Sequence, residues 1–301
     1  MNFIAIILVL VSCFTHAGWN LASKFKTPSA AFFALSTLSA VVVMTPLYIH
    51  FSPHLLQVPL RLWGFVIAAG FCEAFCFIGL GNSYRLNDIS LAYPLTLSLP
   101  VLLVPLVCWC IGYGKPLSFL AISGMIVIAT GCIILPLKAI NFSLLKQYFQ
   151  YSFLFVVLTA VGITGFTVID SMGVTVLKLG DKPLTTMQAA LFYVAFDYLF
   201  AALFLWSYVW LSRRERANVR TIRQNSLHYP ILAGPVVAVT YTLVLLAMQF
   251  ASNVSYIVAF RQVSVLIGVF FGFFILKEKA TPFKIIGTLL IFAGLVLAAL
   301  G

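Results

Sequence analysis

Charged residues are scarce in this chain of 301 residues. Asp, Glu, Lys and Arg together make up 8% of the sequence, and only 7 residues are acidic. A soluble globular protein carries a charged side chain at about a quarter of its positions, so the sequence lacks the surface that a cytosolic enzyme or a disordered chain requires. Hydrophobic residues instead form 62% of the sequence, and its mean hydropathy is +1.10. This composition predicts a polytopic membrane protein.

Motifs of catalysis and metal binding are also missing. The sequence has no His-Glu-x-x-His, no Gly-x-Ser-x-Gly, no P-loop and no Rossmann fingerprint. Its 6 cysteines all lie inside apolar runs, which excludes a disulfide scaffold and favours small buried side chains over zinc ligands. We therefore expect no enzymatic activity, no cofactor and no metal.

Ten segments are apolar over the length that a membrane-spanning helix needs, which is about 20 residues. They cover residues 3–22, 30–50, 62–83, 90–112, 117–137, 151–170, 186–211, 228–250, 254–276 and 282–300. The connections between them are mostly short, so no soluble domain is expected. The predicted fold class is an all-α polytopic membrane protein with ten transmembrane helices.

The basic residues are distributed unequally over the connections. Thirteen of the 18 Lys and Arg residues lie after odd-numbered segments, and four lie after even-numbered ones. The positive-inside rule then places the odd connections in the cytoplasm and both termini outside. The net charge of +11 is explained by this topology, so we expect no nucleic-acid partner. The arginine-rich connection from Arg213 to Arg223 is interpreted as an orientation signal, with a lipid or partner patch as the alternative.

The two halves of the chain resemble each other. The start of the fourth segment aligns with the start of the ninth at an offset of 165 residues, and Gly124 and Gly131 align with Gly287 and Gly294 at an offset of 163. Each half holds five segments, and because five is odd, the second half must enter the membrane from the opposite side. The sequence thus predicts inverted five-helix repeats around a central cavity. Their expected boundaries are residues 1–140 and 141–301.

The ionisable residues of the apolar segments that are candidates for a function are His16, Glu73, Asp170, Asp197 and Arg261. Each costs a few kcal/mol in a bilayer and so indicates a function or a buried partner. For Glu73 and Arg261 a transport role and a structural ion pair are equally compatible with the sequence. We expect Asp197 to bond a neighbouring Tyr or Trp, and His16 to hold an adjacent helix. Asp170 would cap the following segment or line the cavity mouth.

Proline and glycine mark two further segments. Pro94, Pro100 and Pro105 all lie in the fourth, where each removes a helical hydrogen bond, so we expect a bent helix that forms a cavity wall. A bend that serves only packing is the alternative. Gly268 and Gly272 in the ninth segment form a Gly-x-x-x-Gly motif, which predicts close helix packing.

Arg261 is the residue with the sharpest expectation. No residue three or four positions away from it is acidic, and a guanidinium does not lose its proton. The repeat places Thr96 opposite Arg261 across the axis where inverted-repeat carriers bind substrate. We therefore expect Arg261 to receive an anionic group of the substrate, with Glu73 as a coupling acid. The alternative is a permanent ion pair with Glu73 or Asp170.

Several stretches resemble one family of membrane proteins. They are His16-Ala17-Gly18-Trp19-Asn20, residues 166–173, Ala259-Phe260-Arg261-Gln262-Val263-Ser264, Leu276-Lys277-Glu278-Lys279 and the helix with Gly287 and Gly294. In these stretches the chain is similar to the ten-helix EamA-type permeases of the drug/metabolite transporter superfamily. A branch of that family has Arg-Glu-Thr-Ser where this chain has Arg261-Gln262-Val263-Ser264.

The resemblance implies two inverted five-helix repeats, with a cavity lined by segments 1, 3, 4, 6, 8 and 9. It also implies secondary transport, often export of amino acids, related metabolites or toxic compounds, and a location in the bacterial inner membrane. Both termini of better-known members are cytoplasmic, which conflicts with the count of basic residues. The residues expected to bind substrate or couple transport are Arg261, Glu73, His16, Trp19, Asn20, Asp170, Tyr93, Thr96 and Tyr256.

Three functions are compatible with the sequence. The leading one is a secondary carrier of a small polar metabolite, with protons as the candidate coupling ion and the bilayer as its surroundings. The second is a flippase for a lipid or lipid-linked carrier, which requires a lateral opening lined by basic residues. The third is a membrane scaffold without transport activity, which requires neither Glu73 nor Arg261.

Overall fold

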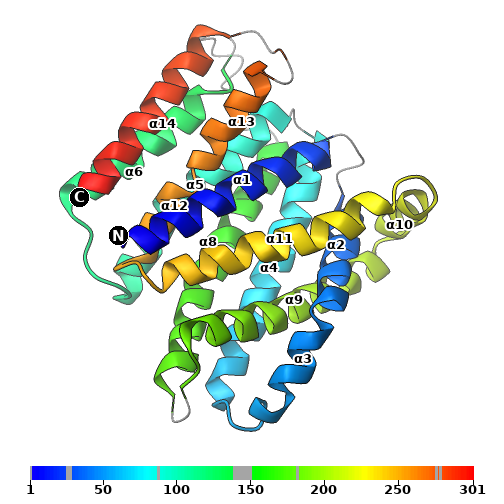
Figure 1. Cartoon of the computed structure of the whole chain (residues 1–301). Helices are drawn as coiled ribbons and strands as arrows, with labels where there is room; N and C mark the ends of the chain where they lie inside the picture. Colours follow the sequence, from blue (N-terminus) through cyan, green and yellow to red (C-terminus); the bar gives the residue numbers. More distant parts are fainter. Residues whose placement is uncertain are drawn as a thin grey trace.

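The computed structural model describes residues 2–24, 29–86, 89–137, 151–180, 183–274, 277 and 280–301, with the side chains of residues 19–24, 89–93 and 151–152 outside this description. Every regular element within these ranges is a helix (Figure 1). The all-helical fold class predicted from the apolar segments is therefore confirmed.

The helices follow the predicted segments closely. The first half forms α1 (Phe3–Lys24), α2 (Ala30–Val43), α3 (Thr45–Phe51), the 3-10 helix η1 (Ser52–His54), α4 (Leu60–Leu86), α5 (Ile89–Ile111) and α6 (Phe119–Ile134). The second half forms α8 (Tyr151–Leu179), α9 (Thr186–Leu211), α10 (Arg213–Asn225), α11 (His228–Met248), α12 (Val254–Phe260), α13 (Val263–Phe274) and α14 (Pro282–Leu300).

The structure departs from the prediction in four places. The second segment is a bent pair, α2 and α3, with an angle of 50° between them, and Pro46 lies in the first turn of α3. The ninth segment, predicted as one helix, is interrupted between α12 and α13. The sixth was expected to end at Asp170, but α8 continues to Leu179, and the Asp170 carboxylate accepts a hydrogen bond from Tyr241 inside the bundle. The arginine-rich connection is itself a helix, α10, which begins at the capping residue Ser212.

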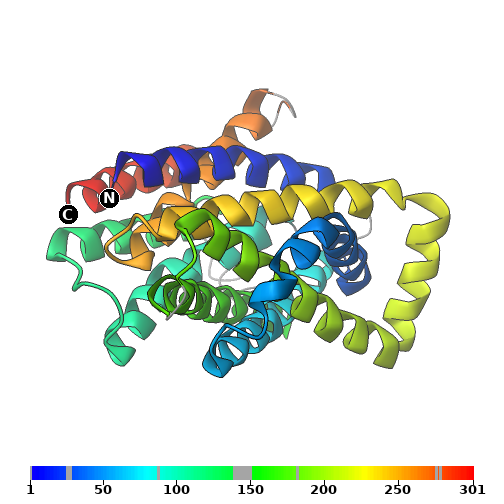
Figure 2. The ribbon, with the colours of Figure 1, turned by 60° about the horizontal axis from the view of Figure 1, so that its bottom comes forward.

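Seven helices in the described residues are long and apolar enough to cross a membrane, or eight if the bent pair of α2 with α3 and η1 forms one span. Two further apolar helices, Phe3–Gly18 and Phe119–Ile134, are shorter. Ten crossings therefore stay a prediction. Figure 2 shows α10 joining the ends of α9 and α11 at one end of the bundle.

Helix contacts made by one half of the chain recur for the corresponding helices of the other half. α4 packs against α8 and α9, and its counterpart α11 packs against α1 and α2. α5 packs against α8 as α13 packs against α1. Other contacts join helices that are counterparts of each other: α2 with α9, α5 with α12, and α6 with α14. This is the pattern expected when two five-helix units are related by a two-fold axis.

The glycines aligned in the sequence make one of these contacts. A Cβ atom at Gly124 would lie 2.7 Å from the carbonyl oxygen of Gly294, and one at Gly131 would lie 2.8 Å from that of Gly287. The absence of side chains thus lets the backbones of α6 and α14, side by side in Figure 1, approach directly. The close packing predicted at Gly268 is wrong, since no described atom lies within 4 Å of a Cβ placed there.

Candidate functional site

A cavity lies at the centre of the bundle, where both halves of the chain meet. Its polar lining residues are His16 from α1, Glu73 and Tyr84 from α4, Thr96 from α5, Thr159 from α8, Tyr198 from α9, Thr240 and Tyr241 from α11, and Arg261. Apolar side chains, among them Phe77 and Phe166, form the rest of the wall. The empty volume is about 630 Å³, counting the part open to the surroundings. This size and composition are typical of a site for a small molecule.

Arg261 lies at the interruption between α12 and α13. The backbone there tightens into three-residue turns: the Gln262 amide donates to the Ala259 carbonyl (3.1 Å), and the Ser264 amide donates to the Arg261 carbonyl (3.0 Å). Irregular backbone at membrane depth is tolerated only where it is buried in protein or lines a cavity. The interruption therefore presents Arg261 at the cavity wall.

Gln262 holds this interruption against α5. Its side chain is 2% exposed, and its amide nitrogen donates to the Leu97 carbonyl at 3.0 Å, across a separation of 165 residues. That separation equals the repeat offset, so Gln262 donates to the residue that the repeat alignment places at the same position in the first half. No role was predicted for Gln262 from the sequence, although the repeat offset of 165 residues pairs positions 97 and 262.

The structure brings Thr96 and Arg261 to the same cavity, as the repeat alignment predicts. Among the described residues, Arg261 forms no ion pair with Glu73 or Asp170, and each of these carboxylates has an oxygen without a hydrogen-bond partner. The alternative of a permanent ion pair is therefore wrong for this structure. The guanidinium is left available to a ligand in the cavity.

The three buried acids lie near one another: Glu73 lines the cavity, and Asp170 and Asp197 lie outside its lining. Asp170 is fully buried and accepts a hydrogen bond from the Tyr241 hydroxyl, so it neither caps a helix nor lines the cavity. Asp197 is also fully buried, but neither carboxylate oxygen has a partner in the described part of the chain. The bond expected from Asp197 to a Tyr or Trp is thus wrong, since Asp197 lies close enough to Glu73 for the two carboxyl groups to interact.

The other predicted residues divide into three groups. His16 lines the cavity and lies within electrostatic range of Arg261. Tyr256 is half-buried and packs against the hydrophobic core outside the cavity lining. The side chains of Trp19, Asn20 and Tyr93 lie outside the described residues.

Residues that the sequence did not indicate supply most of the hydroxyl groups. Thr159, Tyr198, Thr240 and Tyr241 all line the cavity. They carry no charge and are common in membrane helices, so only their convergence in space distinguishes them. Tyr198 is notable because its hydroxyl is buried without a hydrogen-bond partner among the described residues.

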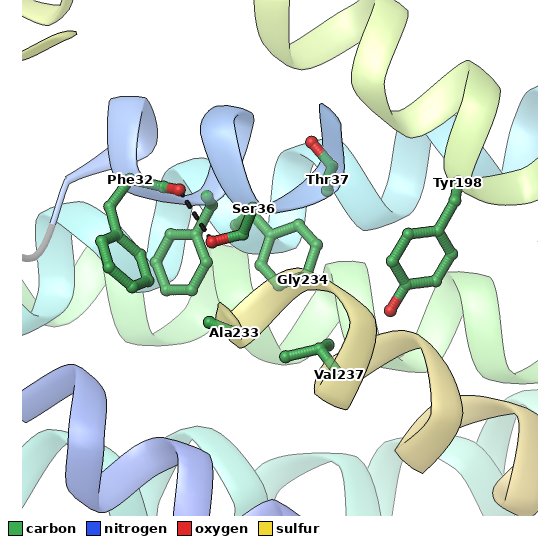
Figure 3. Close-up of a pocket in the computed structure, with 9 residues that line it drawn as sticks. Phe32, Ser36, Thr37, Tyr198, Ala233, Gly234 and Val237 are labelled. Carbon is green, nitrogen blue, oxygen red and sulfur yellow. Dashed lines mark hydrogen bonds between the residues drawn. The ribbon is translucent and has the colours of Figure 1, made fainter. Parts of the chain in front are cut away.

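A second, smaller cavity adjoins the first and shares Phe77, Tyr198 and Val237 with it. Its empty volume is about 250 Å³, and it lies between α2, α4, α9 and α11. Figure 3 shows Tyr198 at one end of this space and Phe32 at the other, where the Ser36 hydroxyl donates to the Phe32 carbonyl. The small cavity is therefore an apolar extension of the central one.

Comparison with known proteins agrees with this architecture. The model of the EamA-like transporter family matches residues 155–300, which agrees with the family that the sequence motifs resemble. No curated protein matches the chain. A solved structure titled "Crystal structure of protein" has a TM-score of 0.66 and 15% identity, with 98% of this chain and 97% of that chain covered.

The fold of that solved structure is shared over nearly the whole chain, including the half that the family model does not match. Together with the seven long apolar helices among the described residues, the family match indicates a multi-pass membrane protein. A non-enzymatic role agrees with this family.

Proposed function

We propose that the protein is a secondary-active transporter of a small polar metabolite with an anionic group, such as an amino acid or a related compound. The observation that carries this proposal is Arg261, a permanent cation that lines a central cavity at a helix interruption without an ion pair among the described residues. A carboxylate of the substrate would form charge-assisted, bidentate hydrogen bonds with it. The hydroxyls of Thr96, Tyr198 and Thr240 would bind its other polar groups.

We also propose that residues 1–140 and 141–301 are inverted repeats that exchange conformations to open the cavity alternately to the two sides of an inner membrane. The matching packing of the two halves supports this proposal. So does the reciprocal contact of Gly124 with Gly294 and of Gly131 with Gly287. The bond between Gln262 and Leu97 would lie near the two-fold axis, where the two repeats must move past each other.

Glu73 and Asp197 supply a site for the coupling ion in this proposal. Two carboxyl groups close together away from water repel each other when both are ionised, and a shared proton would relieve this repulsion. Glu73 lines the cavity and Asp197 lies behind it, so a proton on the pair would respond to a substrate anion at Arg261. Protons are therefore the coupling ion that the geometry favours.

The cavity lining favours a carrier over the two alternative functions. A flippase requires several basic residues along a lateral opening, and Arg261 is the one Lys or Arg residue in the described lining of the cavity. A scaffold does not need an unpaired charged group inside the bilayer, because such a group destabilises the protein there. Arg261, which has no ion pair among the described residues, therefore argues against a scaffold.

The test is transport by purified protein in proteoliposomes. A panel of amino acids would be compared with the same compounds in amide form, which lack the carboxylate. Arg261→Ala should express and elute as wild type but bind about 10- to 150-fold more weakly, the value of a hydrogen bond to a charged group, about 1.5–3 kcal/mol. Arg261→Lys should recover part of this loss, because it keeps the charge without the bidentate geometry.

Arg61→Ala is the matched control, since Arg61 is exposed at the start of α4 and should leave transport unchanged. Normal transport by a well-folded Arg261→Ala protein would contradict the proposal. Equal transport of amino acids and their amides would exclude the carboxylate as the recognised group.

A further inference from the structure

The arginine-rich helix α10 carries a feature that positive-inside topology does not require. Arg213, Arg216, Arg220 and Arg223 are spaced by three, four and three residues, so they share one face of the helix. All four line a single open groove between α9 and α10, with an empty volume of about 970 Å³. An orientation signal needs positive charges in a connection, but it does not need them aligned along a groove.

Among the described residues, no acidic side chain lines the groove and could neutralise these charges. The single acid of α10, Glu215, points the other way and is 4% exposed. Its carboxylate accepts hydrogen bonds from the Ala31 amide (2.9 Å) at the first turn of α2 and from the Asn218 side chain (3.2 Å). Glu215 therefore fixes α10 to the bundle, and the arginine face has no counter-charge among the described residues that line the groove.

The other wall of the groove is aromatic. Trp206 and Trp210, at the end of α9, line it together with the arginines. The Trp206 indole donates to the Ala34 carbonyl at 3.1 Å, whereas Trp210 is 74% exposed. Tryptophan at the end of an apolar helix is typical of the membrane interface, where the ring lies at the level of the lipid head groups.

We propose that this groove binds the head group of an anionic phospholipid. The arginines would hold the phosphodiester by bidentate hydrogen bonds, and Trp206 and Trp210 would pack against the glycerol and upper acyl chains. A free phosphate ion would use the same guanidinium groups, but the exposed aromatic wall and the position at the end of α9 favour a lipid. The site lies apart from the central cavity, with which it shares no lining residue.

The experiment uses the full chain in detergent, titrated with phosphatidylglycerol, phosphatidylcholine or inorganic phosphate. Bound lipid is counted by native mass spectrometry, and the midpoint of thermal unfolding is followed in parallel. Phosphatidylglycerol should bind saturably and raise the midpoint, and phosphatidylcholine and phosphate should do neither. Arg220→Gln should weaken phosphatidylglycerol binding about fivefold, the effect of about one kcal/mol per arginine at a lipid surface.

Arg214→Gln is the matched control, because it removes the same charge from the same helix but lies outside the groove lining. It should retain wild-type affinity, and Arg220→Lys should lose affinity although it keeps the charge. Both positions are exposed, so the variants should fold, which the elution profile checks. Equal losses in Arg214→Gln and Arg220→Gln would reveal diffuse attraction and overturn the site. Stabilisation by inorganic phosphate alone, or equal binding of phosphatidylcholine, would also overturn it.

Discussion

Replacement of Gly124 by alanine tests the contact between α6 and α14. The added Cβ would lie 2.6 Å from the Ala298 amide nitrogen and 2.7 Å from the Gly294 carbonyl oxygen. Both atoms belong to backbone and cannot rotate away, so the two helices must separate. Overpacking of this kind costs about 1–3 kcal/mol. The expected result is a lower midpoint of thermal unfolding, measured by tryptophan fluorescence in detergent.

Gly268→Ala is the control for this prediction. No described atom lies within 4 Å of a Cβ at position 268, so this variant gains helix propensity without a clash. Alanine is favoured over glycine by about 1 kcal/mol within a helix, and this gain applies to both variants. Their difference in stability therefore isolates the cost of the contact.

The proposed two-fold relation between the halves leads to a second expected result. A Cβ at Gly294 would lie 2.6 Å from the Gly124 carbonyl oxygen, so Gly294→Ala should destabilise the protein about as much as Gly124→Ala. If Gly124→Ala unfolds at the same temperature as Gly268→Ala, the helices do not approach as closely as described. If Gly124→Ala and Gly294→Ala differ widely, the contact is not symmetric.

Three further predictions concern the cavity and the topology. Gln262→Leu should destabilise the protein by about 1–3 kcal/mol, because the Leu97 carbonyl loses its side-chain donor; thermal unfolding equal to wild type would exclude this role. Tyr241→Phe should lower the unfolding midpoint by removing the hydroxyl bonded to Asp170, whereas Tyr198→Phe, which removes a hydroxyl without a described partner, should not; equal effects would show that the Asp170 bond is unimportant. Reporter fusions at Asn218 and at the C-terminus should lie on opposite sides of the membrane, with Asn218 cytoplasmic; a cytoplasmic C-terminus would contradict the topology derived from the basic residues.

Some residues of the cavity could be predicted from the sequence, and others could not. Arg261, Glu73 and His16 could be found because ionisable groups are rare in apolar segments, and Thr96 could be found from the repeat offset. Asp170 could be found for the same reason as Glu73, but the place of its side chain in the bundle depends on Tyr241, a residue 71 positions away. A single charge in an apolar run shows that a partner is required and does not identify which partner the packing will supply.

The sequence by itself determined the membrane class, the approximate limits of the helices and the relation between the glycines of α6 and α14. These properties follow from hydrophobicity summed over about 20 neighbouring residues and from spacing along the chain. Only the tertiary structure decided that the ninth segment is interrupted at Arg261, that the three acids lie near one another and that four arginines face one groove. The reason is that each of these depends on contacts between residues far apart in the chain, such as Gln262 with Leu97 and Glu215 with Ala31.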